Sequence, residues 1–145
     1  MRSPSCTAPA PPALVLFLLV LVWCADSAAF FVGRRYGRRR LASRVSPGKS
    51  VEGVLGAMLA GALLAGAAAP LGGVPAPLPF VALSVLTVIT SVLGDLTESA
   101  FKRRAGVKDS GSLIPGHGGV LDRIDSLTAA APLFVLGYHW LGGMQ

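Results

Sequence analysis

Residues suited to handling a charged group gather near the carboxyl end of the chain. Lysines, arginines, aspartates, a serine and a histidine share this stretch with several glycines, and hydrophobic segments flank it. Ionisable residues beside membrane segments are costly to keep near hydrocarbon and are usually functional. Phosphate and a divalent metal are the ligands that this mixture of charges favours. The residues are Asp95, Ser99, Lys102, Arg103, Lys108, Asp109, His117, Asp122, Arg123 and Asp125.

The carboxylates of this stretch follow a helical spacing. If the helix continues past Gly94, Asp95 shares one face with Ser99 and Lys102. Asp122 and Asp125 are three residues apart and share a face of the next predicted helix. Hard oxygen ligands of this kind suit Mg²⁺ or Mn²⁺ better than zinc. The alternative is that the carboxylates only form ion pairs with the neighbouring cations.

Three glycines surround His117 in the segment from 114 to 119, and two of them are Gly118 and Gly119. Glycine lets backbone N–H groups approach an anion closely. With the cations beside it, the segment is predicted to cradle a polyphosphate. The alternative is a flexible loop that only joins two helices.

Two upstream stretches carry further polar candidates. Ser46, Lys49 and Glu52 belong to a predicted turn into a helix, with Ser50 as the N-cap and Lys49 near phosphate. Asp26 lies inside the first hydrophobic segment, where a carboxylate needs a partner or a metal. The alternative for Asp26 is an aspartate that reaches up to the membrane surface.

Composition places these residues on a helical membrane protein. The chain has 145 residues, of which 52% are hydrophobic and 14% charged, and its mean hydropathy is +0.63. We expect an all-α, polytopic fold with about four transmembrane helices and the active site at their cytosolic ends. Residues 1–11 are expected to be a disordered lead-in. The expected spans are residues 12–32, 51–71, 78–96 and 126–143.

The placement of the cations argues against nucleic acid as a partner, although the net charge is +6. Apart from Arg2, every lysine and arginine lies between the first two spans or between the last two. The positive-inside rule therefore puts both charged loops in the cytosol, with the protein multi-pass in the cell membrane. Anionic membrane lipids are the natural neighbours of such loops.

This pattern resembles the phosphatidate cytidylyltransferases, also called CDP-diacylglycerol synthases. Three further stretches agree with that family, at residues 26–34, 46–53 and 94–99. Every fixed position of the family signature is present, and so many fixed charges make the pattern highly specific. In this chain the signature consists of Ser99, Lys102, Arg103, Lys108, Asp109, Pro115, His117, Gly118, Gly119, Asp122, Arg123 and Asp125.

The resemblance implies that CTP and phosphatidate give CDP-diacylglycerol and pyrophosphate at a Mg²⁺-dependent site. It implies that Asp95 and Asp122 bind the metal. The implied catalytic residues are Lys102, Arg103, Asp122, Arg123 and Asp125. The implied substrate-binding residues are Asp26, Ser46, Lys49, Glu52, Ser99, Lys108, Asp109, His117, Gly118 and Gly119.

One departure from the family concerns length. Family members generally carry several more amino-terminal membrane helices, so residues 12–145 are expected to be the catalytic region alone. Either the chain is a truncated version of the family, or a partner or a second copy of the chain, in a homo-oligomer, supplies the missing scaffold. Two alternatives stay open: a related CTP-dependent lipid kinase, and a non-catalytic membrane fragment that binds anionic lipid.

Overall fold

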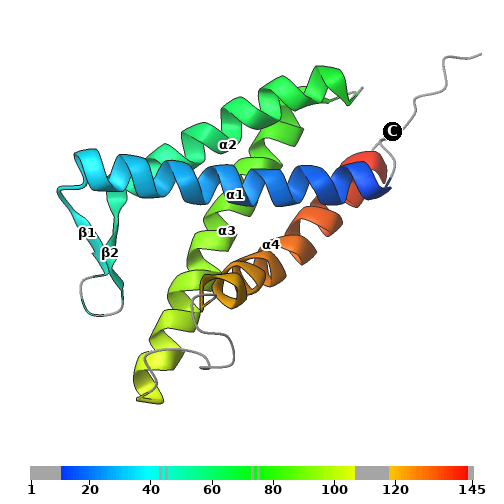
Figure 1. Cartoon of the computed structure of the whole chain (residues 1–145). Coiled ribbons are helices and arrows are strands. Elements are labelled where there is room, and N and C mark those ends of the chain that lie inside the picture. Colours follow the sequence, from blue (N-terminus) through cyan, green and yellow to red (C-terminus); the bar gives the residue numbers. More distant parts are fainter. Residues whose placement is uncertain are drawn as a thin grey trace, which may run out of the picture.

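Four long helices and one hairpin make up the computed structural model, which describes residues 11–42, 44, 46–72, 74, 76–106 and 118–143 (Figure 1). The predicted four helices are therefore confirmed. Two of them continue beyond the predicted spans at their carboxyl ends, and the last begins earlier than predicted. The elements are α1 Pro11–Tyr36, β1 Arg40–Ala42, β2 Ser46–Ser50, α2 Val51–Leu71, α3 Pro77–Arg104 and α4 Gly118–Gly143.

Three of these helices are long and apolar enough to cross a membrane: Pro12–Tyr36, Val51–Leu71 and Pro77–Arg104. α4 is long enough, but its last turns include Tyr138, His139 and Trp140 and are less apolar. The fold is that of a multi-pass membrane protein.

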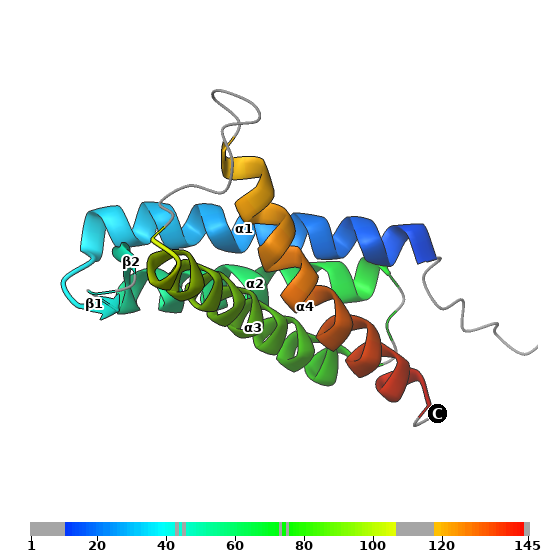
Figure 2. The ribbon, with the colours of Figure 1, turned by 90° about the horizontal axis from the view of Figure 1, so that it is seen from below.

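Small residues bring α1 and α2 close together. The residues Gly53, Ala57, Gly61, Ala65 and Ala69 recur every fourth position of α2, and all are buried. A Cβ atom added to Gly53 would lie 2.8 Å from the Ala29 carbonyl oxygen in α1. Small side chains allow membrane helices this approach. α1 and α2 consequently lie side by side as antiparallel neighbours, as both views show (Figure 2).

Aromatic side chains pack together at the end of the bundle that lies away from the hairpin. Phe17 of α1 packs on Phe80 of α3, with ring centroids 5.1 Å apart, and on Phe134 of α4, at 5.8 Å. Phe134 also stacks on Tyr138 at 6.3 Å. These contacts tie α1, α3 and α4 together far from the hairpin, and leave the charged end to be organised separately.

The hairpin between α1 and α2 was not predicted. β1 and β2 pair antiparallel, with Arg40 opposite Ser50, so the expected turn at residues 46–50 is a strand. The Val51 N–H donates to the Arg39 carbonyl at 2.9 Å. The Arg39 N–H in turn donates to a Glu52 carboxylate oxygen at 3.3 Å. These two bonds fix the base of the hairpin to the first turn of α2.

Hydroxyl side chains along α3 bond within their own helix. Each donates to the carbonyl four residues earlier, at distances between 2.8 and 2.9 Å. Such bonds satisfy a hydroxyl where water is absent. The donors are Ser84, Thr87, Thr90 and Thr97.

Candidate active site at one end of the bundle

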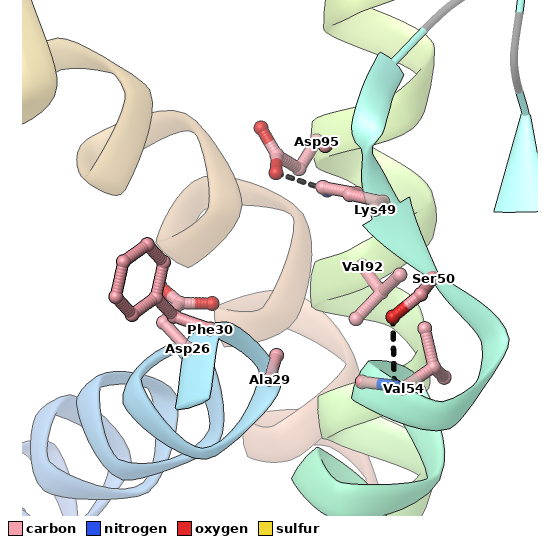
Figure 3. Close-up of a pocket in the computed structure, with 10 residues that line it drawn as sticks. Asp26, Ala29, Phe30, Lys49, Ser50, Val54, Val92 and Asp95 are labelled. Atoms are coloured by element: carbon pink, nitrogen blue, oxygen red, sulfur yellow. Dashed lines mark hydrogen bonds and ion pairs between the residues drawn. The ribbon is translucent and has the colours of Figure 1, made fainter. Parts of the chain in front are cut away.

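A cavity of about 250 Å³ lies where α1, β2, α2 and α3 meet (Figure 3). Among the described residues, its charged side chains come from three different elements: Asp26 from α1, Lys49 from β2 and Asp95 from α3. The remaining lining is small or apolar. It consists of Ala29, Phe30, Gly48, Ser50, Gly53, Val54 and Val92.

Local structure fixes the position of the Lys49 backbone. The next residue, Ser50, is buried and caps α2, because its side-chain oxygen accepts from the Gly53 N–H at 3.2 Å. The cap predicted for Ser50 is therefore confirmed. Since β2 runs directly into α2, the capped turn holds the backbone of Lys49 at the cavity.

Lys49 forms an ion pair with Asp95 across the cavity, as Figure 3 shows. The two residues are 46 positions apart in the sequence. Their side chains are 26% and 32% exposed, so water and small ions can reach both. The predicted ion-pair alternative for Asp95 involved only cations of its own stretch, and pairing with Lys49 was not anticipated.

Asp26 supplies a second carboxylate to this cavity. It is half-buried on α1, one helical turn before Ala29 and Phe30, which also line the cavity. The structure thus places Asp26 beside a cavity between helices, and whether its side chain also reaches the membrane surface stays a prediction.

The polar stripe predicted along the end of α3 is present, because the helix continues to Arg104. Within it Glu98 and Lys102 form an ion pair one turn apart. Ser99 is half-buried and Arg103 is exposed. The alternative in which a carboxylate pairs with a neighbouring cation is therefore seen for Glu98.

The structure places the remaining predicted residues only in part. Ser46 is in β2, and Asp122, Arg123 and Asp125 are in α4, but their side chains are outside the part of the chain that is described. Lys108, Asp109 and His117 fall outside the described residues altogether. The pairing of Asp95 with Asp122 around a metal stays a prediction.

The glycine segment needs a correction. Gly118 and Gly119 were predicted to belong to a loop, whereas they form the first turn of α4. Apolar residues at 120, 121 and 124 continue the helical spacing of α4 toward its amino end. An apolar face at this spacing favours a helix despite the low helix propensity of glycine.

The carboxylates suit a hard divalent cation. Mg²⁺ typically takes one or two protein carboxylates and completes its shell with phosphate oxygens and water. Asp26 and Asp95 meet that requirement at one cavity. Within the residues described, no group of three or more His, Cys, Asp or Glu side chains surrounds a common point. A cation here would therefore need oxygens from the substrate or from residues beyond the described set.

The apolar lining was missed by the sequence analysis, although part of it carried a signal. Ala29 and Phe30 follow Asp26 at three and four residues, and Val92 precedes Asp95 by three. Side chains at these spacings share a helix face. The positions of Asp26 and Asp95 therefore predict these helical neighbours as the walls of the site.

The fold and the cavity define a membrane protein with charged side chains at a hollow where its helices meet. Residues 9–141 match the cytidylyltransferase family, and the chain belongs to this family. The resemblance found in the signature residues is thereby confirmed.

Relatives named phosphatidate cytidylyltransferase include the following three. The Haemophilus influenzae protein is 56% identical over 133 residues, which cover 88% of this chain and 46% of that protein. The Pseudomonas aeruginosa protein is 52% identical, with 90% and 48% covered. The Bacillus subtilis protein is 42% identical, with 81% and 44% covered. The chain thus spans about half the length of these relatives.

A solved structure shares the fold. It is described as an intramembrane enzyme for archaeal membrane lipids biosynthesis, with a TM-score of 0.63 and 24% sequence identity. The match covers 84% of this chain and 76% of that one. It supports the helical membrane architecture.

Proposed function

We propose that the chain carries the reaction site of a phosphatidate cytidylyltransferase. A phosphate oxygen of phosphatidate attacks the α-phosphorus of CTP and forms the new P–O bond. The bond from the α-phosphorus to the bridging oxygen breaks, and pyrophosphate leaves with its electron pair. The products are CDP-diacylglycerol and pyrophosphate.

One observation carries the proposal: three separate stretches that resemble the family meet at a single cavity. Residues 26–34 contribute Asp26, residues 46–53 contribute Lys49, and residues 94–99 contribute Asp95. Nothing in the packing of helices alone requires these stretches to share a hollow. The high identity to proteins named phosphatidate cytidylyltransferase supports the same activity.

The charges match the difficulty of the reaction, since both substrates are anionic. Lys49 at the cavity, with Lys102 and Arg103 on α3, would offset the repulsion between the phosphates. We assign Arg123 to the positioning of phosphate and Asp125 to the positioning of cations. Because phosphatidate is already ionised, the step needs no general base.

Asp95 and Asp122 would hold Mg²⁺ or Mn²⁺, which supplies charge neutralisation on the phosphates and the leaving group. Lys108, Asp109 and His117, with the first turn of α4, are proposed to contact CTP. Asp26, Ser46, Glu52 and Ser99 are proposed to position the substrates around these groups. Glu52 also has the structural task of holding the hairpin.

We propose that the charged end faces the cytosol of a cell membrane. The hairpin and the carboxyl end of α3 lie at the same end of the molecule, opposite the start of α1 and the end of α4 (Figure 1). Arginines are concentrated at that end, as the positive-inside rule requires. Thiol labelling of Arg44→Cys, in a chain whose Cys6 and Cys24 are replaced by serine, tests this side in intact spheroplasts: a membrane-impermeant reagent should fail to react until the membrane is opened.

The decisive experiment uses the 145-residue chain in nanodiscs with phosphatidate, Mg²⁺ and CTP labelled either in cytidine or in the γ-phosphate. A cytidylyltransferase moves the cytidine label into lipid. A related lipid kinase, offered an isoprenoid alcohol, would move only the γ-phosphate label. Failure to transfer either label overturns catalysis by this chain.

A second function is favoured by the hairpin region. Its arginines are exposed, and within the described residues none of them forms an ion pair. Such a surface suits anionic lipid head groups. A non-catalytic lipid-binding protein would retain vesicle binding in Asp95→Asn while the parent chain shows no CTP-dependent product. The arginines are Arg34, Arg35, Arg38, Arg39, Arg40 and Arg44.

A further inference from the structure

We propose that Lys49 is an exchangeable counter-ion, which neutralises Asp95 until a divalent cation and the nucleotide arrive together. The inference rests on the metal role proposed for Asp95. It adds a reason why the metal would bind weakly alone and tightly with CTP.

The ion pair defines a competition. The Lys49 ammonium contacts one oxygen of Asp95, and both side chains line the cavity that also receives Asp26. A divalent cation on the same carboxylate would face a like charge a few ångströms away, and that repulsion opposes binding. Metal and ammonium therefore exclude one another at Asp95.

The exchange needs only a side-chain movement. The Ser50 cap and the Val51–Arg39 backbone bond fix the chain on the carboxyl side of Lys49. Lysine has a flexible four-carbon stem, so its ammonium can leave Asp95 while the backbone stays in place. The cavity of about 250 Å³ beside it has room for that movement.

The released ammonium can contact phosphate only when the nucleotide is present. With metal alone, Lys49 loses its ion pair with Asp95 and has no phosphate to contact. With a metal-bound nucleotide, the same ammonium can contact a phosphate oxygen within the cavity. Metal and nucleotide binding are therefore coupled, and by linkage each strengthens the other equally. Lys49 acts here as a positioning residue that sets the order of loading.

The test measures Mn²⁺ binding by electron paramagnetic resonance on the purified full chain in phosphatidylcholine nanodiscs, whose zwitterionic lipid adds no net charge. Without nucleotide, Lys49→Gln and the apolar Lys49→Met should bind Mn²⁺ about tenfold more tightly than wild type, because the competing charge is gone. Lys49→Arg keeps the charge and should bind no more tightly than wild type.

Arg44→Gln is the matched control. It removes one positive charge from the same hairpin, at an exposed position away from the cavity. A general change in surface potential would affect Arg44→Gln and Lys49→Gln alike, whereas the proposed competition affects Lys49→Gln alone. Equal Mn²⁺ affinities for these two variants overturn the inference.

Nucleotide supplies the second measurement. The ratio of Mn²⁺ affinities with and without a non-reactive CTP analogue should fall about tenfold in Lys49→Gln, because the coupling is lost. An unchanged ratio contradicts the inference and leaves the cytidylyltransferase proposal intact. Asp95→Asn tests the metal role of Asp95 itself. If this variant binds Mn²⁺ as wild type does, both that metal role and the inference about Lys49 are overturned.

Discussion

The two ion pairs at the charged end of the molecule differ in what they join. Lys49 and Asp95 connect the hairpin to α3 across 46 residues, whereas Glu98 and Lys102 are neighbours on one helix. The second pair forms wherever α3 is helical. The first exists only when α1, the hairpin, α2 and α3 are assembled. The ion pair at the cavity therefore depends on tertiary structure, whereas the ion pair in the last turns of α3 depends on helical structure alone.

The same difference extends to the surroundings of each pair. Around the cavity, a capped helix start and a close glycine approach hold three elements within contact distance. At the end of α3, Arg103 and Arg104 are exposed, although the Lys102 and Glu98 side chains themselves are only 22% and 20% exposed. Substitutions in the cavity region should consequently affect activity and folding more than substitutions beyond it.

Asp95→Asn should give the largest effect, because it removes both the ion pair and the proposed metal ligand. We expect CDP-diacylglycerol formation to fall by about three orders of magnitude, roughly 4 kcal/mol of transition-state stabilisation. Labelled cytidine in the lipid fraction measures it. Thr97→Ala, whose hydroxyl bonds only to its own helix at Leu93, should keep wild-type activity. Similar activity in both variants would remove Asp95 from the reaction.

Gly53→Ala should give the next largest effect, on stability. The added methyl would meet the Ala29 carbonyl at 2.8 Å and the Ser50 hydroxyl oxygen at 3.1 Å. Separating α1 from α2 should cost about 1–3 kcal/mol, seen as a lower Tm in detergent. Gly66→Ala is the matched control on α2, since nothing lies within 4 Å of its added Cβ. If Gly66→Ala destabilised as much, the close approach would not be the cause.

Ser50→Ala should give a moderate effect on the start of α2. Loss of the cap to the Gly53 N–H should cost about 1 kcal/mol. Faster hydrogen exchange in the first turn of α2, measured by mass spectrometry, is the expected sign. Ser27→Ala, an exposed serine on α1, should leave that exchange unchanged. Equal exchange in the two variants would show that the hairpin holds the helix start without the cap.

The smallest effect is expected for the coupling between Glu98 and Lys102. A double-mutant cycle of Glu98→Gln and Lys102→Gln, measured by reversible unfolding, should give about 0.3–0.5 kcal/mol, as for other pairs one turn apart. The same cycle on Lys49 and Asp95 should give more than about 1 kcal/mol, because its partners are held by separate elements. Equal coupling energies would erase the distinction between the two regions.

Much of the fold was predictable because apolar runs long enough to span a bilayer determine the helices. The Ser50 cap and the stripe from Asp95 to Lys102 follow from local rules of helix ends and helix faces, and both are present. The hairpin was not predictable, since an arginine-rich segment has no alternating pattern of apolar residues. The pair of Lys49 with Asp95 depends on packing between distant segments, which spacing along the sequence does not specify.

Membrane insertion of α3 and α2 should follow different courses. Because Ser84, Thr87 and Thr90 donate to carbonyls of their own helix, α3 can leave the translocon for lipid without waiting for a partner. α2 instead has a face of glycine and alanine, which gains van der Waals contact only against a neighbouring helix. Its neighbour α1 is synthesised first. The order of the helices along the chain therefore gives the dependent helix its partner at the moment it emerges.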